Sequence, residues 1–167
     1  LRTFRPSRTF VTATSTAAAT TSAPRLPRGA KIRLKEVDDQ GRAHAAGRRK
    51  TAVARVWIKP GDGSMVVNGM PHTEYFCGLT QRGDMIQPFF YTQTLGKFDV
   101  WCTVTGGGFS GQSQAIQLGV ANALQKFDPN YRPRLKAAGM LQRDLRVVER
   151  KKPGRLKARK KSQWVKR

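Results

Sequence analysis

Three glycines near the middle of the 167-residue chain have the spacing of a phosphate-binding loop. Gly106, Gly108 and Gly111 follow the pattern G-x-G-x-x-G in the segment TVTGGGFSGQS, between a strand-like stretch and a helix-like one. In dinucleotide-binding proteins, such glycines let the backbone approach a pyrophosphate at the start of a helix. The spacing therefore raises the question of whether a nucleotide binds here.

The sequence around the loop argues against a nucleotide site. A dinucleotide fold needs a second strand after the helix, with an acid that binds the ribose. Here the helix runs into Asp128–Asn130 and then into another helix-like segment. A Walker loop would end in Gly-Lys-Ser/Thr, and this loop ends in GQS. Two interpretations stay open: a tight strand-to-helix connection that needs positive φ, or a seat for RNA phosphates made of free N–H groups.

The charge of the chain favours a polyanionic partner. It has 32 Lys and Arg residues against 10 Asp and Glu residues, a formal charge of +22 at pH 7. Such an excess repels itself unless a polyanion neutralises it, and nucleic acid is the first candidate, ahead of an anionic membrane surface. No apolar run approaches the roughly 18 to 20 residues that cross a bilayer. We therefore expect no membrane partner.

The cysteines and histidines do not indicate a metal site or a disulfide framework. Cys77 and Cys102 form no C-x-x-C pair, and His44 and His72 have no thiol or carboxylate cluster beside them. We expect no metal, no cofactor and no small-molecule substrate. Cys102 lies on the apolar face of a strand-like segment, so we expect it to fill core volume.

Alternating apolar residues predict the strands that must position these groups. In the segment from 51 to 59, one face carries Ala52, Ala54, Val56 and Ile58, and the other carries Val53, Arg55, Trp57 and Lys59. The turn signal KPGDGS and the short apolar segment MVVNG follow, so we predict a hairpin. Another alternating strand, KFDVWCTVT, has on one side Phe98, Val100, Cys102 and Val104.

Helical signals predict four helices. The segment PHTEYF predicts a short one, and LTQRGDMIQP predicts a second that ends at Pro88. The third follows the glycines, with Ser110 as a candidate N-cap. Its apolar stripe consists of Ile116, Val120, Ala123 and Phe127. The last lies in YRPRLKAAG, where Gly139 is a natural left-handed stop.

The sequence divides into a globular domain at 47–139, a basic N-terminal extension at 1–46 and a basic C-terminal tail at 140–167. The first 30 residues are rich in Ser, Thr, Ala and Arg, and no acid precedes Glu36. This composition indicates an import segment and linker, with a disordered basic arm as the alternative. The first residue is not Met, so we expect that upstream sequence was removed or is not shown.

The C-terminal tail has too few apolar residues to pack. From Arg150 to Arg167, ten of eighteen residues are Lys or Arg, and none is acidic. Such a segment can lie along phosphates and release counterions, and Trp164 among the cations can stack on a base or a ribose. A localisation-like cluster or a solubilising tail is the alternative.

Four ordered motifs resemble one family. They are GRRKTAVARVWIKPGDGSMVVNG, VTGGGFSGQSQAIQLGVANAL, LKAAGMLQRDLRVVERKKPG and KARKKSQWVKR, and they are similar to small-subunit ribosomal protein nine over 47–167. The resemblance implies an α+β fold: a single two-layer domain with a four-stranded sheet backed by helices, like domain 2 of ribosomal protein five, plus an extended basic tail. It implies a structural role in translation and no enzymatic activity. The basic N-terminal segment suggests the mitochondrial version, in the matrix, ahead of a chloroplast one.

The resemblance also implies the partners: small-subunit rRNA, neighbouring proteins of the subunit head, and P-site tRNA. The residues expected at the rRNA are Arg48, Arg49, Lys50, Gly106, Gly107, Gly108, Ser110, Gln112, Arg143, Arg146, Arg150, Lys151, Lys152, Arg155, Lys157, Arg159, Lys160 and Lys161. The residues expected near the tRNA are Trp164, Lys166 and Arg167. The family usually has Phe and Ser before the final pair. Here Trp164 keeps a stacking surface, and Val165 lacks the hydroxyl.

Two other functions are alternatives. One is a nucleotide-dependent enzyme that uses Gly106–Gly111, which saturable binding of ATP, GTP or NAD would support. The other is a general nucleic-acid packaging protein, which would bind any duplex with similar affinity through charge alone.

Overall fold

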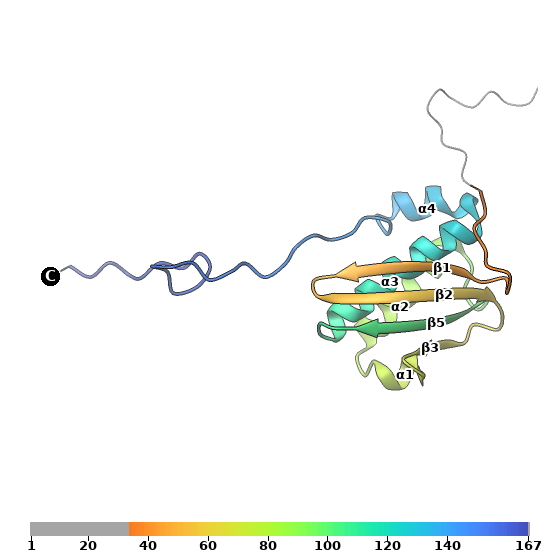
Figure 1. Cartoon of the computed structure of the whole chain (residues 1–167), viewed down its shortest axis with the longest axis horizontal. Helices are drawn as coiled ribbons and strands as arrows, with labels where there is room; N and C mark the ends of the chain where they lie inside the picture. Colours follow the sequence, from red (N-terminus) through yellow and green to blue (C-terminus); the bar gives the residue numbers. More distant parts are fainter. Residues whose placement is uncertain (1–33, 167) are drawn as a thin grey trace, which may run out of the picture. The chain divides into compact units, whose positions relative to one another are not determined.

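Five strands form one mixed sheet in the order β1-β2-β5-β3-β4 (Figure 1). The strands are β1 (Ala43–Arg49), β2 (Ala52–Pro60), β3 (Met65–Val67), β4 (Met70–Pro71) and β5 (Phe98–Thr105). All pairs are antiparallel except β3 with β5. The structure is a computed structural model that describes residues 34–166. The predicted import segment lies outside the described residues. The α+β class is confirmed, and the strand beyond the expected four is the two-residue β4 at the sheet edge.

The helices pack against one face of this sheet. They are α1 (His72–Tyr75), α2 (Leu79–Thr92), α3 (Phe109–Phe127) and α4 (Arg132–Ala137), with a 3-10 turn at Pro129–Tyr131. α3 contacts β1 and β2, and α2 packs against α3. Along β1, β2 and β5, buried residues alternate with exposed or half-buried ones. The domain therefore has two layers, and the second face of the sheet is left open among the described residues.

The predicted hairpin between β2 and β3 is wrong. β2 pairs with β1, across the two-residue turn Lys50–Thr51, and with β5. β3 instead runs parallel to β5. The cause is Asp99 near the start of β5, whose Oδ1 accepts the backbone N–H groups of Asp62, Gly63 and Ser64 at 3.1, 3.1 and 2.9 Å. This carboxylate binds the turn to β5, so the next strand continues on the far side of β5.

β1 was missed because its sequence, AHAAGRR, has small residues in place of the β-branched ones typical of strands. Small residues are needed here because α3 lies directly on the strand. A Cβ on Gly47 would lie 1.9 Å from the Ala115 carbonyl oxygen, and a Cβ on Gly119 of α3 would lie 2.6 Å from Val56 Cγ2. The strand begins at Ala43, before the domain boundary suggested by composition.

Two helix boundaries also differ from the predictions. α2 continues through Pro88 to Thr92, and it ends where Gln93 adopts φ 59°. Pro88 is buried, so its apolar contacts offset the backbone hydrogen bond that proline cannot make. α3 begins at Phe109 after Gly108, with no side-chain cap. Ser110 therefore lies inside the first turn and is not the N-cap.

The other helix and core predictions are confirmed. The α3 stripe faces the core, with Ile116 and Val120 buried, and Gly139 ends the α4 segment with φ 72°. Cys102 is buried among the core residues. Its burial raises the pKa of the thiol to about 12, so the side chain stays protonated near neutral pH. The described residues after Gly139 contain no helix or strand.

Candidate nucleic-acid interface

The β1–β2 turn and the glycine loop lie at the same end of the sheet. Pairing of β2 with β5 places Val53 opposite Thr105. A Cβ on Gly106 would lie 2.7 Å from the carbonyl oxygen of Thr51. We call residues 48–51 and 106–112 together the basic edge. The fold thus joins two segments that sequence analysis had considered separately.

The glycine loop is a tight connection between β5 and α3. Gly106 and Gly107 have φ of 74° and 67°, in the left-handed region that favours glycine. A Cβ on Gly107 would also lie 3.1 Å from that of Ala52. The Gly108 carbonyl then accepts the N–H groups of Gly111 and Gln112 at 2.8 and 2.9 Å. In the described part of the chain no strand follows α3, so the second strand of a dinucleotide fold is missing there.

A hydrogen-bond network that sequence analysis missed holds the loop. Gln112 Nε2 donates to the Gly106 carbonyl at 3.1 Å, and Gln112 Oε1 accepts from the Tyr75 hydroxyl at 3.0 Å. Asn68 Nδ2 donates to Tyr75 Oη at 3.3 Å, and Asn68 Oδ1 accepts from the Val104 N–H at 2.9 Å. Both ends of the Gln112 amide are thus bonded within the protein. Gln112 therefore positions the loop, whereas the side chains of Phe109 and Ser110 in the first turn of α3 are exposed.

The tail begins at an ion pair with the basic edge. Arg49 Nη1 donates to the Asp144 carboxylate, and the two side chains are 20% and 23% exposed. Asp144 also accepts from Arg146, through the backbone N–H at 2.9 Å and Nη2 at 2.6 Å. These hydrogen bonds, those from Arg146 first and then that from Arg49, hold the pKa of Asp144 well below its usual range. The carboxylate is therefore charged at neutral pH and fixes the root of the tail.

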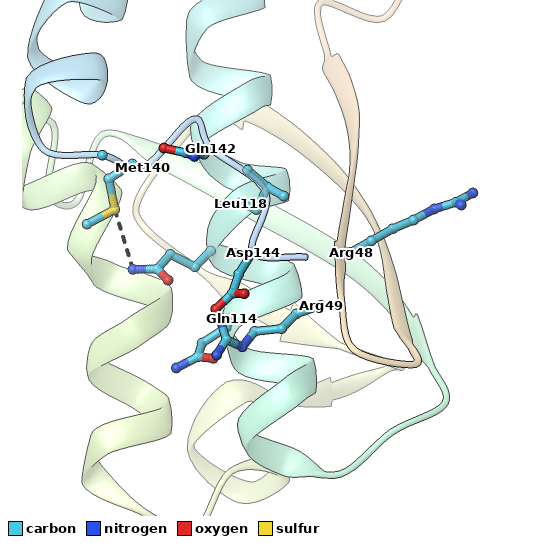
Figure 2. A pocket seen from close by; sticks show the side chains of 9 residues that line it. Arg48, Arg49, Gln114, Leu118, Met140, Gln142 and Asp144 are labelled. Atoms are coloured by element: carbon cyan, nitrogen blue, oxygen red, sulfur yellow. Dashed lines mark hydrogen bonds and ion pairs between the residues drawn. The ribbon is translucent and has the colours of Figure 1, made fainter. Parts of the chain in front are cut away.

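A small pocket lies at this root, with a volume of about 130 Å³. Figure 2 shows Arg49 turned toward Asp144 and Gln114, whereas Arg48 points away from them. Arg48 and Lys50 are exposed. The three cations of the edge thus differ: Arg49 binds the tail, and the other two face outward.

The tail presents cations to its surroundings over most of its length. Among the sequence-predicted site residues in 143–166, Arg155 is half-buried and the rest are exposed, and Trp164 is 88% exposed. Arg159 donates to Glu149 through Nη2 at 2.5 Å and Nε at 2.9 Å, which closes a loop within the tail. Hydrogen bonds from Arg159 lower the pKa of Glu149. Arg167 lies outside the described residues.

Residues 34–166 contain neither a metal-binding cluster nor a membrane-spanning helix. No group of three or more His, Cys, Asp and Glu side chains is arranged to hold a metal ion there. In the same residues, no helix combines the length and apolar character needed to cross a membrane.

Comparisons with known proteins point to one family. The family model described as ribosomal protein S9/S16 matches residues 47–167. The chain is 54% identical over 138 residues to small ribosomal subunit protein uS9m of Arabidopsis thaliana, covering 83% of this chain and 32% of that protein. It is 48% identical over 137 residues to small ribosomal subunit protein uS9 of Rickettsia bellii, covering 82% of this chain and 84% of that protein. The chain thus spans about a third of the Arabidopsis relative.

Proposed function

Because the chain belongs to the ribosomal protein S9/S16 family, we propose that it is a structural component of the small ribosomal subunit of mitochondria. The family consists of structural ribosomal proteins, so the chain is not an enzyme, as the sequence analysis expected. The mitochondrial assignment is supported by the 54% identity to uS9m and by the predicted import segment. The neighbouring proteins of the subunit head are its protein partners in this proposal.

We propose further that the basic edge and the tail bind the small-subunit rRNA. The observation that carries this proposal is the run of exposed tail cations that starts from a fixed root at Asp144. Lys and Arg side chains of this kind neutralise phosphates and release counterions. Arg48 and Lys50 face outward beside the N–H groups at the start of α3, where a phosphate is favoured. Arg49 and Gln112 take positioning roles in this scheme, because their side chains are bonded within the protein.

The end of the tail is proposed to reach the P-site tRNA. Trp164 has a free aromatic face in the described residues and stands two positions before Lys166. An exposed indole beside cations suits stacking on a base or ribose, with charge contacts to the adjacent phosphates. In this proposal Trp164 stacks, and Lys166 and Arg167 contact phosphates.

The salt dependence of rRNA binding tests the proposal. Full-length chain is titrated with a transcript of the head region of small-subunit rRNA at several salt concentrations. The double variant Lys151→Ser/Lys157→Ser should reduce the slope of log K against log salt by about 1.5, because each phosphate contact contributes about 0.7 to 0.9. Lys97→Ser/Lys136→Ser is the matched control, since both residues are exposed and lie outside the edge and the tail.

The control should leave the slope close to that of the parent chain. If the two double variants lower the slope equally, net charge alone drives binding, and the general packaging alternative is correct. A parent slope near zero would contradict rRNA binding through phosphates altogether.

A further inference from the structure

The open face of the sheet carries a row of three aromatic side chains. The strand register places His44 opposite Trp57, and Trp57 opposite Trp101, on the adjacent strands β1, β2 and β5. The rings of His44 and Trp57 are 5.1 Å apart between centroids, with their planes at 31°. Trp101 is 40% exposed. Two of the three tryptophans of the chain therefore lie on a face that no described residue covers.

Cations surround this row on the same face. Arg55 lies in the next row toward the basic edge, opposite Thr103, and Lys59 lies in the preceding row, opposite Asp99. Neither Arg55 nor Lys59 forms a side-chain hydrogen bond or ion pair with any described residue. The Asp99 carboxylate is already hydrogen-bonded to three N–H groups of the turn before β3. The face is thus both aromatic and positively charged.

A hollow opens beside the exposed tryptophan. It has a volume of about 300 Å³ and is lined by Gln40, Arg42, Lys59 and Trp101. The hollow thus combines an exposed ring on which a base can stack with the side chains of two cations, Arg42 and Lys59.

This combination distinguishes between possible occupants. The outer face of an antiparallel sheet is ordinarily polar. If this face packed against an apolar protein surface, aliphatic side chains would be expected around the rings. Here the rows beside the rings carry Arg55 and Lys59, which a flat, negatively charged partner would match. Unpaired nucleotides have exposed base faces and phosphates, whereas the bases of a duplex are stacked and closed.

We propose that the open sheet face binds unpaired nucleotides, with bases stacked on Trp101 and on the His44–Trp57 pair. Arg42, Arg55 and Lys59 meet the phosphates or the base edges. The proposal rests on the proposed function, since the small-subunit rRNA is the strand expected to supply these nucleotides. It assigns to the domain a way of recognising RNA that differs from the phosphate contacts of the tail.

Aromatic pairs across strands also stabilise a sheet without any ligand, so the test needs a binding readout. The full-length Trp164→Phe variant is used, because its tryptophan fluorescence then reports only Trp57 and Trp101. It is titrated with a ten-nucleotide unpaired RNA and with a blunt ten-base-pair RNA duplex at equal total phosphate concentration. Quenching is expected with the unpaired RNA and not with the duplex.

Affinities of the variants then separate stacking from charge. In the same background, Trp101→Ala should weaken binding of the unpaired RNA by about 5- to 150-fold, as loss of one stacked base predicts. Its affinity for the blunt duplex should be unchanged, and Trp101→Phe should recover most of the loss. Phe90→Ala is the matched control, since Phe90 is 65% exposed on α2, away from the open face.

Three outcomes would overturn the inference. Binding of unpaired RNA without quenching is one, and equal weakening of both RNAs by Trp101→Ala is another. The third is a reconstituted particle that keeps the Trp101→Ala chain but loses a neighbouring protein, which would assign the face to a protein contact. Failure of the proposed function looks different: the fluorescence of the Trp164→Phe chain would be quenched by the unpaired RNA, but the parent chain would not bind the rRNA transcript.

Discussion

The folded domain and the C-terminal tail are both positively charged, but the domain is a packed sheet with helices, whereas the described part of the tail has no helix or strand. In the domain, buried small or apolar residues alternate with more exposed residues along β1 and β2, and the buried ones pack against α3. In the tail, cations follow one another with few apolar residues between them, and the described residues form no helix or strand. Folding therefore follows the apolar pattern, whereas charge indicates the partner.

The two regions are joined where Arg49 of β1 binds Asp144. One of the few acids in a basic chain thus holds a cation of the domain and a cation of the tail together. If the domain supplies the fold and the tail supplies binding, substitutions in the domain, in the tail and at this joint should change stability and binding separately.

The largest effect is expected from overpacking the domain. Gly47→Val should destabilise the protein by about 3 kcal/mol or prevent folding, because a Cβ there would lie 1.9 Å from the Ala115 carbonyl oxygen. The measurement is denaturant unfolding followed by circular dichroism.

A glycine with open space around it supplies the control. Gly83→Ala, within α2, should stabilise the protein by roughly 0.5 to 1 kcal/mol, because nothing lies within 4 Å of its added Cβ. Equal loss of stability in both variants would show that the close contact between α3 and β1 is not the cause.

A middle-sized effect is expected from shortening the tail. Deleting residues 162–167 should leave the unfolding midpoint unchanged, since the described ones are all exposed. Reconstituted subunits should bind P-site tRNA about 5- to 150-fold more weakly, through the loss of one stacking contact and its charges. A chain with the same segment replaced by Gly and Ser controls for length. Subunits that assemble and keep full tRNA affinity would contradict the assignment of the tail end.

The smallest effect is expected at the joint and should depend on pH. The pKa of Asp144 is lowered in the folded state, so its carboxylate adds stability above the unfolded-state value of about 3.9. This contribution is lost as the pH falls through the lower folded-state value. Asp144→Asn should therefore be slightly less stable than the parent at pH 7, and the gap should narrow below about pH 4. Unfolding curves at pH 7 and pH 3 measure the gap, and a gap that widens in acid would contradict the role of the carboxylate.

Much of the fold could be predicted because its apolar period is clear. β5 and α3 repeat apolar residues at strand and helix spacing, and Gly139 ends the last helix as expected. β1 could not be predicted, because its inward residues are small for the sake of α3, a contact distant in sequence. The partner of β3 depends on hydrogen bonds from a turn to Asp99, which no local pattern reports.

The residue types of the candidate site could be predicted from the sequence, but their positions relative to one another could not. The cations of 48–50 and the glycines of 106–108 stood out in the sequence, but only strand pairing brings them together. The tie between Arg49 and Asp144 joins residues far apart in the chain. The aromatic row was hidden for the same reason, since His44, Trp57 and Trp101 belong to three separate segments.

The loop closed by Glu149 and Arg159 shortens the distance that the tail can reach from the domain. Fully stretched, residues 145–166 would span at most about 75 Å, at roughly 3.4 Å each. The ion pair joins residues ten positions apart, so the closed loop takes up about 30 Å of that extended length. Because the tail starts from a fixed point, opening this pair together with the hydrogen bonds from Leu156 N–H to Lys160 O and from Arg155 Nη1 to Arg159 O would lengthen the tail toward a distant target, and no part of the domain would have to unfold.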